Sequence, residues 1–282
     1  MTRRRIKFLR FFSAKMKTPI PRTAFTNRQG AKGKLLSASV GLVTGGTKGI
    51  GAATAIALAA EGADVAIVGR RLDAGAKETR QRIEALGSRC LFIRADVGVG
   101  LEATRCVEET ARKLGPVDVL VHAAGGPVNG GLLELTPEAW QSAFDVHVHA
   151  IFHLCRAAIP AMKQKKRGVI ILISSAAGIR GIKTNVAYQA VKGTLPQLAR
   201  ALAFEFANDN IRVNCVAPGV IRTAFHAAMP AQVKQNNLEN RIPLHREGTP
   251  EQVASLIREL VTNDYITGET VSVDGGLTMR IC

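Results

Sequence analysis

From Val40 onward, short runs of β-branched and aliphatic residues alternate with alanine-rich stretches. Apolar runs of this kind are typical of buried parallel strands, and the stretches between them have the length of helices. The alternation predicts a single-domain α/β protein with a doubly wound parallel sheet and helices on both faces. The seven predicted strands are VGLVTG (40–45), DVAIVG (64–69), CLFIRAD (90–96), VDVLVHAAG (117–125), GVIILISS (168–175), IRVNCVAPG (211–219) and TVSVDGG (270–276).

Helices are predicted in the intervals between these strands. Two of them begin with threonine followed by proline, at Thr136 and at Thr249. Threonine is a good N-cap and proline is well suited to the first helical position, so both pairs mark helix starts. The predicted helices lie near residues 50–61, 73–86, 101–114, 136–166, 187–207 and 250–262.

The chain has 282 residues, of which 46% are hydrophobic, and this is enough for one large core. Its formal charge of +16 would suit a nucleic-acid or membrane partner, but residues 1–39 hold 11 Lys/Arg and no Asp/Glu. The remainder has 27 basic and 22 acidic residues and is only mildly basic. We therefore predict a basic, disordered N-terminal extension over 1–34, a domain over 35–282, and neither nucleic-acid nor membrane binding.

The extension has three interpretations: an export signal, an organelle transit peptide, or an unstructured segment that includes an upstream start. Export is disfavoured because charged residues, Arg10, Lys15 and Lys17, interrupt the apolar stretch that a signal needs. We favour the unstructured segment. The five cysteines show no C-x-x-C spacing, and they predict free thiols in a reducing, cytoplasmic compartment and no metal site.

A glycine-rich turn, VTGGTKGIGAATA, joins the first strand to the first helix. Its glycines, Gly45, Gly49 and Gly51, follow a G-x-x-x-G-x-G spacing, which differs from the G-x-G-x-x-G fingerprint of the common dinucleotide-binding unit. The physical demands are the same: a tight turn, close approach of backbone N–H groups to phosphate, and no Cβ between helix and strand. The turn predicts a dinucleotide site.

The second strand ends in Gly69, Arg70 and Arg71, where a carboxylate would bind a ribose 2′-hydroxyl and repel a 2′-phosphate. Arginine offers a planar, permanent cation that suits phosphate, and Lys48 in the glycine turn adds another positive charge nearby. These cations predict NADP(H) rather than NAD(H). The alternative is a solvated arginine pair at a strand end.

Tyr188 and Lys192 lie four residues apart on a predicted helix and so share one face. An ammonium beside a phenol is expected to lower the pKa of the phenol, and this would let Tyr188 exchange a proton at neutral pH. Ser175 ends the fifth strand and can hydrogen-bond the same substrate oxygen. The three residues predict proton transfer to an oxygen whose carbon exchanges a hydride with nicotinamide.

Taken together, these motifs resemble those of the short-chain dehydrogenase/reductase family, in its 3-oxoacyl-carrier-protein reductase and glucose dehydrogenase branch. The resemblance extends from about Leu35 to Leu277 and rests on TGGTKGIG, Asp96, HAAG (122–125), Ser175, YQAVK, NCVAPGVIRT (214–223) and YITGETVSVDGG (265–276). It implies a Rossmann-type fold with Tyr188 as general acid/base, Lys192 also bound to the nicotinamide ribose, and Ser175 orienting the carbonyl. The cofactor-binding residues it implies are Gly45, Thr47, Lys48, Gly49, Ile50, Gly51, Arg70, Arg71, Asp96, Val97, Ala124, Gly125, Tyr188, Lys192, Pro218, Gly219, Val220 and Thr223.

Two positions depart from the family pattern. His147 stands in FDVHV where the family usually has asparagine, which helps to hold a water that links the lysine to solvent. His147 is therefore a candidate catalytic residue in an altered proton relay, or a buried histidine whose hydrogen bonds are satisfied. HAAG replaces the usual NNAG, so His122 and Ala123 take asparagine positions whose role is mainly packing beside the cofactor.

Pro196 lies inside the predicted catalytic helix, four residues after Lys192. Proline removes a backbone donor and conflicts with the carbonyl four residues earlier. The helix is therefore either kinked one turn after Lys192 or irregular there without consequence.

These features predict a secondary alcohol or ketone as substrate. An alternative is a 3-oxoacyl group on an acidic carrier protein, for which KQKKR (163–167) could provide a basic docking surface, although Asp209 opposes it. An alternative of another class is an NADP-binding scaffold with weak catalysis. The lid segment 220–248 shows only spread arginines and predicts no charged substrate group. In the relatives that the chain resembles, the apolar last strand and the short tail pack against a neighbouring subunit, so the resemblance implies a homotetramer, with a dimer as the next alternative.

Overall fold

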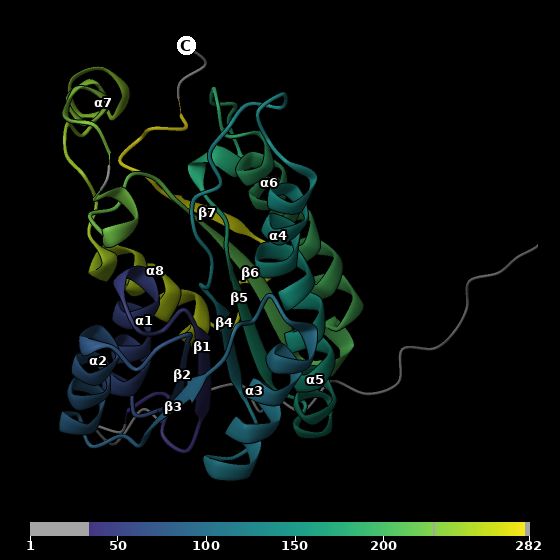
Figure 1. Ribbon diagram of the computed structural model, residues 1–282. Helices are drawn as coiled ribbons and strands as arrows, with labels where there is room; N and C mark the ends of the chain where they lie inside the picture. Colours follow the sequence, from purple (N-terminus) through teal and green to yellow (C-terminus); the bar gives the residue numbers. More distant parts are fainter. Residues whose placement is uncertain (1–33, 228, 280–282) are drawn as a thin grey trace, which may run out of the picture.

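The computed structural model describes residues 34–227 and 229–279, which form a seven-stranded sheet surrounded by helices (Figure 1). All strands are parallel, in the order β3-β2-β1-β4-β5-β6-β7. The predicted doubly wound α/β fold is confirmed. The N-terminal extension falls outside the described residues, apart from Lys34.

The seven strands coincide with the seven predicted apolar runs. Most are buried along their whole length, as expected for strands covered on both faces. Their bounds are Val40–Thr44 (β1), Asp64–Gly69 (β2), Cys90–Arg94 (β3), Val119–His122 (β4), Gly168–Ile173 (β5), Ile211–Pro218 (β6) and Thr270–Val273 (β7).

Helices cover both faces of the sheet and enclose two apolar clusters (Figure 1). One face is covered by α1 (Gly49–Ala60), α2 (Ala74–Ala85) and α8 (Pro250–Thr262). The other is covered by α3 (Gly100–Lys113), α4 (Pro137–Phe144), α5 (Ala150–Lys165) and α6 (Val186–Glu205). A short α7 (Ala231–Asn236) lies in the segment between β6 and α8.

Both predicted threonine caps are present. The Thr136 hydroxyl accepts from the N–H of Ala139 at 3.2 Å, and Thr249 forms a reciprocal capping box with Gln252. Each cap satisfies a backbone donor that the first helical turn leaves unpaired, and this fixes where α4 and α8 begin.

The helix predicted over 136–166 is interrupted. Between α4 and α5 the backbone forms a π-helical turn over Asp145–His149. A π turn inserts one residue into the helical repeat and rotates the following side chains, so that His147 is directed inward and is only 1% exposed. The sequence pattern predicted the helix and missed this turn.

Among the described residues, no helix combines the length and the apolar character that a bilayer crossing requires. The four cysteines in this part of the chain, Cys90, Cys106, Cys155 and Cys215, are free, as predicted. Burial raises the pKa of the Cys155 thiol to about 12 and that of the Cys215 thiol to about 11, so both favour the neutral, unreactive form.

The amino-terminal edge of the sheet is held by one buried carboxylate. Asp118 is fully buried and accepts from the backbone N–H of Val40 at 3.0 Å, from Lys165 at 2.9 Å and from Arg167 at 2.9 Å. It thereby joins β1, β4 and the start of β5. A buried carboxylate is stable only with such a complete set of donors.

We expect Asp118→Ala to lower the free energy of unfolding by about 2–4 kcal/mol, because it leaves a buried N–H and two cations without their acceptor. Urea unfolding followed by circular dichroism measures this. Asp209→Ala is the matched control, since Asp209 pairs with Lys163 and Lys166 at the surface and should cost less. Equal losses in the two variants would contradict the role given to Asp118.

Candidate active site

Two adjoining cavities lie at the carboxyl-terminal edge of the sheet. One, the Tyr188 cavity, has a volume of about 1090 Å³, and the other, the glycine-loop cavity, about 1050 Å³. Gly125, Pro127 and His147 line both, so the two cavities are contiguous. They form where β1 and β4 lead to helices on opposite faces, which is the usual ligand position in doubly wound sheets.

The predicted site residues distribute between these cavities. The Tyr188 cavity is lined by Ile50, Gly125, His147, Ser175, Tyr188, Lys192, Pro218, Gly219, Val220 and Thr223. The glycine-loop cavity is lined by Gly45, Thr47, Lys48, Arg70, Arg71, Asp96, Val97, Ala124, Gly125 and His147. Of the predicted residues, Gly49 and Gly51 line neither.

The glycine turn has the tight geometry that its spacing predicted. Gly45 has φ +66° and Gly49 has φ +55°, conformations that side chains disfavour. A Cβ on Gly51 would lie 2.2 Å from the carbonyl oxygen of Gly45, so α1 begins in direct contact with the turn. No side chain caps α1, whose N-cap is Lys48, and the first-turn N–H groups remain available to an anion.

The end of β2 carries the cations that were predicted to select the cofactor. A Cβ on Gly69 would lie 2.6 Å from Cγ2 of Thr47, so a carboxylate side chain could enter this position only if Thr47 moved. Arg70 and Arg71 are exposed and form no ion pair with any residue that the structure describes. Asp73, the nearest acidic residue along the chain, accepts from the N–H of Ala76 and caps α2.

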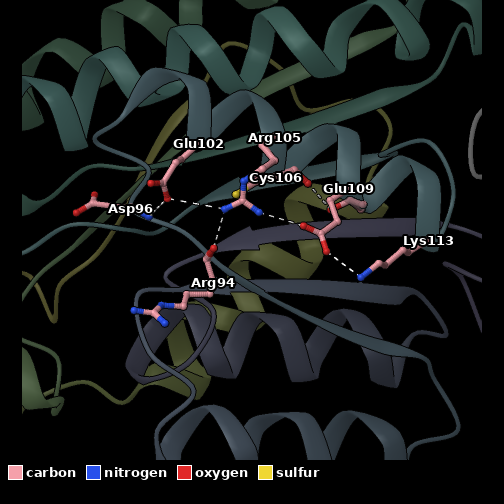
Figure 2. Close-up of polar contacts among 8 residues, drawn as sticks. Arg94, Asp96, Glu102, Arg105, Cys106, Glu109 and Lys113 are labelled. Carbon is pink, nitrogen blue, oxygen red and sulfur yellow. Dashed lines mark hydrogen bonds and ion pairs between the residues drawn. The ribbon is translucent and has the colours of Figure 1, made fainter.

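The loop after β3, which carries Asp96, is fixed by the first turns of α3 (Figure 2). The Glu102 carboxylate accepts from the Asp96 N–H at 2.7 Å, and Arg105 donates to the Arg94 carbonyl at 2.8 Å while pairing with Glu109. Asp96 itself accepts from the N–H of Gly98 at 3.0 Å. These bonds hold Asp96 and Val97 at the wall of the glycine-loop cavity.

Ser175, Tyr188 and Lys192 meet at the end of β5. The Ser175 hydroxyl accepts from the N–H of Ala177 at 3.1 Å, and its own proton therefore remains available for donation. Lys192 is 6% exposed; its Nζ donates to the Ile173 carbonyl at 2.8 Å and lies 5.7 Å from the Tyr188 ring centroid. The structure thus brings the three predicted residues to one cavity.

The charge states of these groups differ in part from the expectation. Burial raises the pKa of Tyr188, and the Ser175 hydroxyl opposes this shift by favouring the phenolate. The predicted net lowering by Lys192 is therefore wrong for this structure. Burial also lowers the pKa of Lys192 to about 8, so that its ammonium can exchange a proton close to neutral pH.

Pro196 does not break α6, which runs unbroken from Val186 to Glu205. Because proline has no N–H, the Lys192 carbonyl lacks its usual intrahelical donor, and the Ser174 hydroxyl donates to it instead at 2.7 Å. A Cβ on Gly178 would lie 2.6 Å from the same carbonyl oxygen. Pro196 therefore allows α6 to bond directly to the segment that carries Ser175.

His122 is a structural residue that lines neither cavity. Its Nδ1 lies 2.9 Å from the Thr44 hydroxyl and its Nε2 lies 3.0 Å from the Val146 carbonyl. The carbonyl requires a proton on Nε2, so Nδ1 accepts from Thr44, whose oxygen accepts from the Ala124 N–H at 3.2 Å. Burial is the main cause that lowers the pKa of His122 to about 3, which keeps the ring neutral.

His147 is only half satisfied. Its Nε2 lies 3.2 Å from the Gly126 carbonyl, while its buried Nδ1 has no hydrogen-bond partner among the described residues. The ring stands edge-on to Tyr188 with centroids 5.9 Å apart. Burial, reinforced by Lys192, lowers the pKa of His147 to about 2. The unpaired Nδ1 argues against the interpretation of a fully satisfied core histidine.

The structure adds lining residues that the sequence reasoning missed. Arg180, Lys183 and Arg241 line the Tyr188 cavity together with Asn129, Asn185 and Asn240. The position of Arg180 and Lys183 between Ser175 and Tyr188 was the only available signal, and nothing in the sequence grouped them with Arg241.

Comparison with known proteins agrees with this geometry. A family model described as "Enoyl-(Acyl carrier protein) reductase" matches residues 45–278. A 3-oxoacyl-(acyl-carrier-protein) reductase of Chlamydia muridarum is 35% identical over 245 residues, 86% of this chain and 98% of that protein. Dehydrogenase/reductase SDR family member 4 of Oryctolagus cuniculus is 34% identical over 253 residues, 87% of this chain and 96% of that protein.

A solved structure of a short-chain type dehydrogenase/reductase from Mycobacterium marinum superimposes with a TM-score of 0.80 at 32% identity. The match covers 87% of this chain and 97% of the other. These relatives identify an oxidoreductase and imply a nicotinamide cofactor. The chain belongs to the short-chain dehydrogenase/reductase family.

We expect acid to destabilise the fold through its buried histidines. Both His122 and His147 have pKa values in the fold below the usual 6.5, so the unfolded chain binds more protons as pH falls below 6.5. Each should cost about 1.4 kcal/mol of stability per pH unit in that range.

Comparing His147→Asn with wild type by urea unfolding from pH 8 to pH 4.5 isolates one of these contributions. The variant should gain stability relative to wild type as the pH falls below 6.5. His149→Asn, an exposed position on the same π turn, is the control. A difference between His147→Asn and wild type that does not vary with pH would show that the pKa of His147 is the same in the fold as in the unfolded chain.

Proposed function

We propose that the protein is an NADP(H)-dependent oxidoreductase that interconverts a secondary alcohol and a ketone, acting on the CH–OH group of its donor. The observation that carries the proposal is the meeting of Ser175, Tyr188 and Lys192 in a cavity contiguous with the glycine turn. When bound, the nicotinamide cofactor supplies or accepts the hydride.

In the proposed mechanism, the Tyr188 hydroxyl moves the proton. Because burial raises its pKa, Tyr188 is protonated at neutral pH and is suited to donate to the oxygen of a ketone that is being reduced. The Ser175 hydroxyl, whose oxygen is already engaged by Ala177, donates a hydrogen bond to the same substrate oxygen and orients it. Lys192, with its pKa of about 8, can then return a proton to the Tyr188 phenolate.

The residues around the glycine-loop cavity fit a phosphorylated dinucleotide. The uncapped start of α1 and the close approach of Gly45 and Gly51 suit the pyrophosphate. Lys48, Arg70 and Arg71 would hold a 2′-phosphate. Asp96, Val97 and Ala124 would lie against the adenosine half, and Pro218, Gly219, Val220 and Thr223 against the nicotinamide.

Tyr188→Phe should lower kcat by about a thousandfold or more, because the phenyl ring keeps its packing against Phe225 but has no proton to give. NADPH oxidation with a panel of ketones measures this. The dissociation constant of NADPH, measured by the fluorescence of the bound cofactor, should remain within about threefold of wild type. Retained turnover in this variant would refute the mechanism and favour a scaffold with adventitious reactivity.

Arg70→Asp should reverse the cofactor preference by removing a cation and adding a charge that repels a 2′-phosphate. We expect kcat/KM with NADPH to fall about a hundredfold while that with NADH changes little or rises. Arg82→Asp, on the exposed side of α2, is the control for adding the same charge elsewhere. An unchanged NADPH/NADH ratio in Arg70→Asp would mean that the enzyme does not recognise the 2′-phosphate here.

A 3-oxoacyl-carrier-protein reductase is the second candidate function, and it is favoured by the relatives that bear this name. The proposed docking surface at 163–167 does not support it. Lys163 and Lys166 pair with Asp209, and Lys165 and Arg167 pair with Asp118. This segment also precedes β5, at the edge of the sheet opposite the catalytic residues.

We further propose a cytoplasmic homotetramer, with a dimer as the next alternative. Large apolar side chains remain exposed at Phe152 of α5, Phe204 of α6, Tyr265 and Met279. Exposed apolar side chains of this kind support association with further copies of the chain.

A further inference from the structure

The Tyr188 cavity has an uneven distribution of charge. Apart from Lys192, its described lining contains three cationic side chains, Arg180, Lys183 and Arg241, and none of the described residues that line it is aspartate or glutamate. These cations come from two segments far apart in the sequence, Arg180 and Lys183 from the loop after β5 and Arg241 from the lid, and none forms an ion pair with a described carboxylate. Arg241 is exposed, as predicted for the lid arginines, and it also lines the cavity.

Hydrogen bonds hold the two arginine side chains, and the backbone around Lys183, in place. Arg180 donates from Nε to the Thr278 carbonyl at 3.1 Å, and its Nη2 has no hydrogen-bond partner among the described residues. Arg241 donates from Nη1 to the buried Asn237 side chain at 2.8 Å. Such anchoring reduces the rotamer entropy that an exposed arginine would lose on binding a ligand.

Lys183 is held through its loop. Gln189, the residue after Tyr188, accepts from the Ile182 N–H at 2.8 Å and donates to the Ile182 carbonyl at 2.6 Å and the Asn185 carbonyl at 3.1 Å. The Gly130 N–H donates to the Thr184 carbonyl at 3.0 Å from the opposite wall. The backbone around Lys183 is therefore fixed on the catalytic helix.

The acidic groups near the lid are already engaged elsewhere. Asp274 accepts from Gly276 and from both the N–H and the hydroxyl of Thr278. Glu247 is largely buried and pairs with Arg222 and Lys234, which do not line the cavity. The three cations are thus left facing a cavity without a counter-charge from these groups.

The remaining lining is apolar near the reacting group. The Phe225 ring lies 5.9 Å from the Tyr188 ring, and Met229, Pro230, Val233 and Leu277 also line the cavity. This wall would accept the carbon skeleton of a substrate. The side chains of Asn129, Asn185 and Asn240 add neutral donors that also suit an anionic oxygen.

We propose that the substrate is an anionic ketone or alcohol, bearing a carboxylate or a phosphate group that Arg180, Lys183 and Arg241 bind. This inference rests on the proposed function and names its substrate class. Carboxylates and phosphates share the charge and the acceptor geometry that arginine recognises. The three cations are specificity residues, and Tyr188 remains the residue that transfers the proton.

The test compares ketones that differ only in charge. One pair is 5-oxohexanoate and its methyl ester, and a second is a 3-oxoacyl pantetheine with and without the 4′-phosphate. Wild-type enzyme should show a kcat/KM at least about tenfold higher for the anionic member of one pair, with the difference mainly in KM. The pair that shows it distinguishes a carboxylate from a phosphate.

A triple variant, Arg180→Gln, Lys183→Gln and Arg241→Gln, should remove that preference by raising the KM of the anionic member to about that of the neutral member. The matched control replaces three exposed cations away from both cavities, Lys77→Gln, Arg82→Gln and Arg112→Gln, and changes the net charge equally. The control should keep the preference for the anion.

Equal kcat/KM for both members of each pair would overturn the inference, as would a preference that survives in the triple variant. If the neutral ketones are reduced in a Tyr188-dependent way, the proposed function stands without the anionic substrate. If no ketone in the panel is reduced, the proposed function and this inference both fail.

Discussion

The active site depends on a cation that the sheet buries. Lys192 belongs to α6, and its ammonium donates to the carbonyl of Ile173 at the end of β5. Burial lowers the pKa of Lys192 from 10.5 to about 8. A shift of this size corresponds to roughly 3 kcal/mol of destabilisation near neutral pH, which is regained as pH rises from 8 towards 10.5. The fold offsets this cost by bonding α6 to the segment after β5. The Ser174 hydroxyl reaches the Lys192 carbonyl, which Pro196 leaves without an intrahelical donor.

The same burial explains why the tyrosine and the lysine do not act as a simple ion pair. A phenol loses solvation when it ionises in an apolar cavity, and Lys192 directs its Nζ towards a backbone carbonyl. The two pKa values are therefore shifted apart: that of Tyr188 rises from 10.0, and that of Lys192 falls from 10.5 to about 8. Both shifts favour the neutral groups, and a phenol that keeps its proton suits the delivery of that proton to a developing alkoxide.

The fold could be predicted from sequence because buried parallel strands leave a strong local signature. Runs such as GVIILI in β5 are β-branched, uncharged and bounded by glycine or lysine-rich turns, and the threonine-proline pairs fix the starts of α4 and α8. The π turn around His147 left no such signature, because one inserted residue changes hydrogen-bond partners without changing composition. The candidate catalytic residues could be predicted because their spacing is local, whereas Arg180 and Arg241 come to one cavity only through the folded lid and the loop after β5.

The distribution of carboxylates distinguishes the two cavities: the described lining of the Tyr188 cavity has none, whereas Asp73, Asp96 and Asp145 line the glycine-loop cavity. Asp118, Asp209 and Glu247 each pair with two cations away from the cavities. Asp73 and Asp274 are bonded to backbone N–H groups near the cavity walls. Cations at both ends of the site, Arg70 and Arg71 at one and Arg180 and Arg241 at the other, are thereby left without acidic partners among the described residues. Because Coulomb attraction between a ligand and such cations is strongest where no protein carboxylate competes, positive potential is concentrated in the Tyr188 cavity, while the folded domain remains only mildly basic as a whole.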